Sequence, residues 1–120
     1  SQKAGVAALT GPQDNMKSML AAYVERRDVI INGLNKIDEF SCSRPKGAFY
    51  AFPNITDTNV SSMDLSTFLI KEARVATIPG SSFGKSGENF IRLSYANSVE
   101  NISKAIDRLA ETMPRLNKSQ

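Results

Sequence analysis

Apolar residues recur at the three- and four-residue spacing of a helix over a long stretch, from Met16 to Ile37. This pattern predicts one long amphipathic helix, which Asp14 is placed to cap. We interpret its apolar stripe as a core or packing face and not as a cofactor box, because Arg26 and Arg27 interrupt the stripe midway. The rest of the fold must supply a surface for this stripe.

The remaining elements are short. The sequence predicts a first helix over 2–9 that ends at Gly11-Pro12, and a surface loop over 54–63 before a helix that Ser62 or Asp64 would cap. A last helix would begin at Asn97 or Ser98 and end at Pro114. Strands are predicted at four places, 40–43, 48–52, 75–78 and 90–95.

This order of elements favours the α+β class. We expect a small, mostly antiparallel sheet of about three or four strands, covered on one face by helices, with the other face left to a partner or to solvent. With 120 residues, the chain is long enough for one compact domain, so residues 1–120 are predicted to form a single domain.

Composition excludes several kinds of site. The chain has no histidine and a single cysteine, Cys42, so it has no Ser-His or Cys-His nucleophile pair, no internal disulfide and no zinc-binding cluster. We predict no metal ligand, and we expect Cys42 to be an inert thiol because nothing nearby in sequence would lower its pKa. The adjacent acids Asp38 and Glu39 lie at a helix end and are interpreted as solvated.

Charge and hydropathy exclude other partners. The formal charge is +3, but basic residues are scattered from Lys3 to Lys118 among acids, so we do not expect nucleic-acid binding. No stretch approaches the ~20 apolar residues that cross a bilayer, and the start of the sequence has no secretory pattern. We therefore expect a cytoplasmic protein without a membrane partner.

The loop Gly80-Ser81-Ser82-Phe83-Gly84-Lys85-Ser86 invites comparison with a phosphate-binding loop. Such a loop needs four residues between its glycines and a helix directly after Lys-Ser, so that backbone N–H groups face the phosphates. Here only three residues intervene and a strand pattern follows, so the spacing fails. Lys85 is also a poor imine-forming amine, because only a desolvated or cation-crowded lysine is reactive at neutral pH.

Arg92 is the most informative single residue. Alternation along 90–95 puts Ile91, Leu93 and Tyr95 on one face of a strand and leaves Arg92 on the other, beside aromatic residues. A guanidinium held on a rigid strand suits bidentate capture of a carboxylate. A solvated or surface-paired arginine is the alternative that the pattern alone leaves open.

Several segments, in order, resemble the fold-type I aminotransferases of the aspartate and aromatic group (class I/II). The segment 1–14 resembles the helix and turn after the cofactor-lysine segment, and Y-V-E-R-R-D at 23–28 resembles the Y-x-x-R-R-D of a long helix. Further matches are R-P-K-G-A-F-Y at 44–50, the P-G-S-S-F-G stretch within 72–84, and N-F-I-R-L-S-Y-A at 89–96. The resemblance covers nearly the whole chain and identifies it as the C-terminal small domain of such an enzyme.

The resemblance implies a role for individual residues. Arg92 matches the arginine that binds the α-carboxylate of the amino-acid or 2-oxo-acid substrate, and Phe49 and Phe83 are expected near the same cleft, with Phe49 alternatively in the core. In the intact enzyme, pyridoxal phosphate would be held by a large domain that precedes Ser1 and supplies the Schiff-base lysine. No catalytic and no cofactor-binding residue is therefore assigned to this chain.

The expected role of the chain follows from that division of labour. The small domain would close over the cleft, deliver Arg92 to the substrate and exclude water, within a transferase of amino-acid metabolism that is a homodimer. Alone, it is predicted to be inactive. Two alternatives stay open: a stand-alone amino-acid-binding module and a dimerisation module without catalysis. Specificity for aspartate, aromatic or alanine substrates is not legible in this part of an enzyme.

Overall fold

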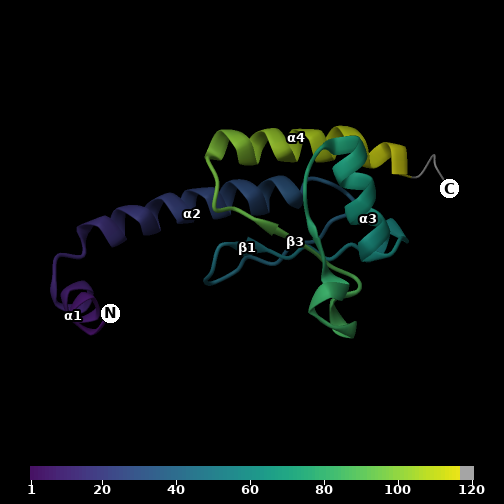
Figure 1. The fold of residues 1–120 in the computed structure, drawn as a ribbon. Coiled ribbons are helices and arrows are strands. Elements are labelled where there is room, and N and C mark those ends of the chain that lie inside the picture. Colours follow the sequence, from purple (N-terminus) through teal and green to yellow (C-terminus); the bar gives the residue numbers. More distant parts are fainter. Residues whose placement is uncertain (117–120) are drawn as a thin grey trace.

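A computed structural model describes residues 1–116 and shows an elongated arrangement of four α-helices and three short strands within that range (Figure 1). None of the helices in this range is long and apolar enough to cross a membrane. In chain order, the elements are α1 (Gln2–Thr10), α2 (Asp14–Leu34), β1 (Tyr50–Ala51), α3 (Ser62–Phe68), β2 (Ile78–Pro79), β3 (Ile91–Ser94) and α4 (Val99–Leu116).

The three strands form one antiparallel sheet in the order β1-β3-β2, which confirms the predicted α+β class. In the register, Tyr50 lies opposite Ser94, and Ile78 lies opposite Arg92. The strand predicted over 40–43 is wrong: only Ser41 forms an isolated bridge, to Asn54. The sheet therefore has three strands among the described residues, with β3 in the centre.

The helix-facing side of β3 carries the core. Ile91, Leu93 and Tyr95 are buried, which confirms the predicted alternation of this strand. Helices α2 and α4 run side by side over this face (Figure 1), and the turn Leu69–Ala73, which continues α3, packs against α4. Buried side chains from both long helices fill the space between them and the sheet: Ile30, Ile31, Leu34, Ile102, Leu109 and Met113.

The long helix is shorter and less buried than its pattern predicts. It ends at Leu34, three residues before Ile37, and its N-cap is Gln13, with Asp14 as the first helical residue. Its buried residues lie only in the last turns, whereas Met19 and Leu20 are exposed. The predicted packing stripe is therefore in contact with the core only at its C-terminal end.

The consequence is a projecting segment, which we call the N-terminal arm: α1 and residues 14–24 of α2. It extends away from the sheet (Figure 1), and the molecule measures 57 × 30 × 23 Å along its principal axes. No residue of α1 is buried.

The strand predicted over 48–52 is reduced to Tyr50 and Ala51. Ala48 has a left-handed backbone with φ of 59°, which leaves the extended geometry of a strand. Its carbonyl oxygen accepts a hydrogen bond of 2.9 Å from the buried Tyr95 hydroxyl group. Tyr95, which directly follows β3, therefore fixes the turn before β1.

The region between α3 and β2 also differs from the prediction. Ser61 caps α3 by accepting a hydrogen bond from the Asp64 backbone N–H, in place of the predicted Ser62 or Asp64. After Phe68 the helix widens into a π-turn, and Arg74 is left-handed with φ of 55°. The extended ladder can start only beyond this bend, so β2 begins at Ile78 and the strand predicted over 75–78 is wrong in its bounds.

Pro114 lies inside α4, which continues to Leu116, so the predicted stop at this proline is wrong. At the other end, the Ser98 hydroxyl oxygen accepts a hydrogen bond from the Asn101 backbone N–H, in agreement with the predicted capping position.

The Gly/Ser loop consists of two 3-10 turns, Gly80–Phe83 and Lys85–Gly87. The loop closes at its base, where Gly80 and Gly87 approach so closely that a Cβ atom on Gly80 would lie 2.0 Å from the Gly87 carbonyl oxygen. A turn and then β3 follow Lys85, where a phosphate-binding loop would have a helix.

Candidate functional site

The Arg92 guanidinium lies between two aromatic rings. Its central carbon is 4.3 Å from the centroid of the Tyr50 ring and 4.6 Å from that of the Phe83 ring. Both distances are within the range in which the negative face of a ring attracts a cation. The two rings restrict the positions that the guanidinium plane can adopt, so the structure holds Arg92 in place on the open face of the sheet.

Two separate elements deliver these rings. Strand pairing places Tyr50 directly opposite Ser94, on the same face of the sheet as Arg92. Phe83 comes from the first 3-10 turn, whose Gly80 N–H donates a 2.8 Å hydrogen bond to the Phe90 carbonyl oxygen. The aromatic pair therefore depends on both the strand register and the loop.

The loop is fastened to the start of α3. The buried Ser62 hydroxyl group lies 3.1 Å from the Ser81 hydroxyl oxygen and accepts a 3.3 Å hydrogen bond from the Ser81 backbone N–H. The Ser62 backbone N–H donates a 2.9 Å hydrogen bond to a Glu88 carboxylate oxygen. These contacts tie both ends of the loop to one helix and so position Phe83.

Further rings extend this surface. Phe52 stacks on Phe90, with centroids 4.9 Å apart and planes only 3° from parallel, and it meets Phe83 edge to face at 6.2 Å. We call Tyr50, Phe52, Phe83 and Phe90 the aromatic face. Because apolar rings surround the guanidinium, an anion bound there would be attracted more strongly than in open water.

Arg92 has no acidic partner among the residues that the structure describes. Within residues 1–116, ion pairs involve Arg27, Arg44 and Arg115, and no carboxylate oxygen lies within 4.0 Å of the Arg92 guanidinium. The surface-paired alternative therefore has no acidic partner among the described residues, and the solvated alternative stays open. Its planar set of N–H donors is free to bind the two oxygens of a carboxylate side by side.

Of the two aromatic residues predicted near Arg92, the structure brings only Phe83 to it. Phe49 is 39% exposed, and its ring contacts those of Tyr23 at 6.2 Å and Tyr50 at 4.5 Å, not the guanidinium. Tyr50 is the residue that sequence reasoning missed. Period-two alternation of the run 48–52 was the signal that could have found it, since Ala51 is buried and its neighbour Tyr50 must face the other way.

Cys42 is buried between elements, and burial raises the pKa of its thiol, although a backbone hydrogen bond from Phe52 acts in the opposite direction. The Asn35 side chain hydrogen-bonds both the Cys42 backbone N–H, at 2.8 Å, and its carbonyl oxygen, at 2.9 Å. A raised pKa disfavours the reactive thiolate, in agreement with the predicted inert thiol.

No other reactive cluster is present in the described part of the chain. His, Cys, Asp and Glu form no group that could hold a metal ion there. Each lysine between residues 1 and 116 is exposed, including Lys85. A solvated lysine lacks the desolvation or cationic crowding that makes its amine nucleophilic at neutral pH.

Comparison with families of known proteins gives a match over residues 1–109 to the model described as "Aminotransferase class I and II". Among curated proteins, the chain is similar to an aspartate aminotransferase of Rhizobium meliloti (strain 1021), with 40% identity over 97% of the chain and 30% of the relative. It is also similar to aromatic-amino-acid aminotransferase 2 of Thermococcus litoralis, with 41% identity over 82% of the chain and 25% of the relative.

Solved structures give the same result. The chain superposes on the aspartate aminotransferase of Rhizobium meliloti with a TM-score of 0.87 and 37% identity, over 95% of the chain and 30% of that structure. The chain therefore spans about 30% of the length of the two Rhizobium meliloti relatives.

Proposed function

The chain belongs to the class I and II aminotransferase family, and from this premise we propose that it is the C-terminal small domain of a pyridoxal-phosphate-dependent enzyme that transfers amino groups between amino acids and 2-oxo acids. In this role it supplies the arginine that binds the substrate α-carboxylate and closes the cleft. Residues 1–120 act as one domain, and the rest of the enzyme is a large domain of the same polypeptide, in a cytoplasmic homodimer.

One observation carries the proposal: Arg92 is held between Tyr50 and Phe83 with no acidic partner in the described chain. An unpaired, partly buried guanidinium costs solvation energy, so its retention is best explained by an anionic ligand. An α-carboxylate matches the two parallel donors of the guanidinium in shape and charge.

The residues of this chain then have defined tasks. Arg92 binds the carboxylate and fixes the orientation of the substrate, while Tyr50 and Phe83 hold the guanidinium plane. Phe52 and Phe90 extend an apolar surface that excludes water from the bound carboxylate. Phe49 has a supporting part, because its ring packs against the Tyr50 ring, with centroids 4.5 Å apart.

Pyridoxal phosphate does not fit the described chain. The cofactor supplies the electron sink for amino-group transfer and needs a desolvated lysine, whereas every described lysine is exposed. We therefore assign cofactor binding to the large domain and expect the isolated chain to be inactive.

The N-terminal arm gives the large domain a place to bind. Six large apolar side chains on the arm are at least 40% exposed: Val6, Leu9, Met16, Met19, Leu20 and Val24. Large apolar side chains left exposed on a projecting segment are of the kind that a protein contact buries. The same surface favours the alternative of a dimerisation module, in which the arms of two copies would pair.

A spectroscopic experiment tests the assignment of the cofactor. The purified chain is mixed with pyridoxal phosphate and then with an amino acid, followed by borohydride trapping and mass mapping. We expect no stoichiometric lysine adduct and no turnover. One specific adduct with an amino-acid-dependent spectral change would refute the small-domain proposal.

A chimera tests the role of Arg92. Residues 1–120 replace the matching segment of the Rhizobium meliloti aspartate aminotransferase. In this chimera, Arg92→Lys is compared with Arg74→Lys, a control at an exposed arginine outside the aromatic face. Arg92→Lys keeps the charge but loses the bidentate geometry, so kcat/KM should fall about 30-fold or more, equivalent to about 2 kcal/mol. Equal values for the two variants would exclude substrate binding by Arg92.

Sedimentation of the isolated chain measures its oligomeric state and so distinguishes the small domain from the dimerisation module. A monomer at micromolar concentration supports the small domain, whereas a dimer that Leu20→Glu dissociates supports the dimerisation module. Saturable amino-acid binding without the large domain, lost in Arg92→Lys, would instead support the stand-alone binding module.

A further inference from the structure

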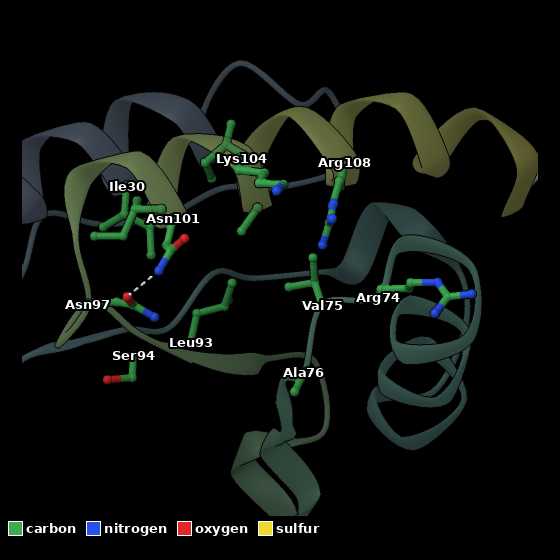
Figure 2. Close-up of a pocket in the computed structure, with 13 residues that line it drawn as sticks. Ile30, Arg74, Val75, Ala76, Leu93, Ser94, Asn97, Asn101, Lys104 and Arg108 are labelled. Carbon is green, nitrogen blue, oxygen red and sulfur yellow. Dashed lines mark hydrogen bonds between the residues drawn. The ribbon is translucent and has the colours of Figure 1, made fainter.

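A cavity of about 390 Å³ lies under α4, on the opposite side of β3 from Arg92. Figure 2 shows it between α4 above, β3 below and the segment 74–76 to one side. Its floor is apolar: Ile30, Val75 and Leu93 are buried side chains that line it. The volume is within the range of small-molecule sites, and nothing in the role of Arg92 uses it.

The polar rim comes from a single face of α4. Asn97, just before the helix, and Asn101, Lys104 and Arg108 follow one another at four- and three-residue intervals, which places them in a row on one side of the helix. In Figure 2, Arg108 reaches down from α4 toward Val75, whereas Arg74 points away from the cavity. The cationic groups at the rim are therefore Lys104 and Arg108.

The rim offers donors and lacks acids. The Asn97 side-chain oxygen accepts hydrogen bonds from the Asn101 amide, at 2.9 Å, and from the Ser98 backbone N–H, at 2.8 Å. No acidic residue lines the cavity, and no carboxylate oxygen of the described residues lies within 4.0 Å of the Lys104 or Arg108 nitrogens.

We propose that this cavity binds a small organic carboxylate that has an apolar body. The Arg108 guanidinium takes the carboxylate, with Lys104, one helical turn earlier on the same face of α4, as a further donor, and the apolar body lies on Ile30, Val75 and Leu93. This site is independent of the one at Arg92.

Chemical-shift titration of the isolated chain with hexanoate tests the proposal. Saturable shifts are expected at the backbone amides of 93–94 and 97–108, with a dissociation constant of about 1 mM. Arg108→Gln should weaken binding at least tenfold, whereas Lys17→Gln, which removes an exposed charge away from the cavity, should leave it unchanged. If Arg108→Gln impairs folding, Lys104→Gln, at an exposed position, gives the same comparison.

Matched ligands separate the two halves of the site. Hexanol keeps the body and acetate keeps the charge, so each should bind at least tenfold more weakly than hexanoate. Inorganic phosphate bound as tightly as hexanoate would show an unspecific anion site and overturn the proposal. The absence of saturable shifts would also overturn the proposal. Shifts that Arg92→Gln abolishes would overturn it too, because they would place hexanoate at Arg92, and they would leave the small-domain proposal intact.

Discussion

The two halves of α2 differ in what surrounds them, although the sequence gives both the same helical pattern. The C-terminal half buries Ile30, Ile31 and Leu34 against α4 and the sheet, whereas the N-terminal half, with α1, exposes its apolar residues. The radius of gyration is 16.9 Å, against about 14 Å for a compact chain of this length. Helical periodicity therefore predicts the helix but not what packs against it. The arm leaves apolar side chains exposed that the core half of the same helix buries.

The largest expected effect comes from the same substitution, leucine to alanine, in each half of α2. Leu34→Ala removes a fully buried side chain and should lower the free energy of unfolding by about 2–5 kcal/mol. Leu20→Ala, at a side chain that is 58% exposed, should change it by less than about 0.5 kcal/mol. Urea unfolding of both variants measures the difference. Equal losses would show that the arm packs as tightly as the core.

The next test concerns the place where the arm meets the sheet. The ring of Tyr95 meets that of Tyr23 edge to face at 6.3 Å, and its hydroxyl group donates to the Ala48 carbonyl oxygen. Tyr95→Phe keeps the ring contact but loses the hydrogen bond, so the free energy of unfolding should fall by about 1 kcal/mol. Thermal unfolding measures it. No change would mean that the left-handed turn at Ala48 is held by other contacts.

The sequence predicted the structure best where the periodicity of apolar residues lies within a single helix or strand. Alternation predicted the buried side of β3 and the placement of Arg92 on the opposite side, because strand geometry is local. It overestimated β1 and β2, whose lengths are limited by the left-handed backbone of Ala48 and Arg74, residues with no glycine-like signal. It missed Tyr50, since the contact with Arg92 depends on the register between strands that are distant in sequence.

The pH dependence of stability tests the core half of the comparison, through the buried Cys42. Burial raises the pKa of Cys42 above that of a free thiol, about 8.5, so the folded state disfavours the thiolate. The stability that this thiol contributes is fully present below that pH and is lost as the pH rises through the folded-state pKa. Urea unfolding between pH 7 and 9.5 should show this decline. Cys42→Ala should lack it, and the same decline in that variant would assign it to another group.

The smallest expected effect comes from deletion of residues 1–13. Because α1 buries no side chain, the free energy of unfolding should change by less than about 0.5 kcal/mol. Amide hydrogen exchange on the whole chain gives the matching observation, with faster exchange in α1 than in α4. Slow exchange in α1 would show that the arm is covered, by another copy or by the sheet.

The base of the loop that carries Phe83 limits how this region can evolve. A Cβ atom on Gly80 would meet the Gly87 carbonyl oxygen at 2.0 Å, and one on Gly87 would meet the Gly80 carbonyl oxygen at 2.1 Å. A side chain at either glycine would therefore clash with the backbone of the other, and no substitution at either position is tolerated without backbone movement. Variation among descendants should accumulate at the exposed residues between them, such as Ser82 and Lys85, while the two glycines are inherited as a unit.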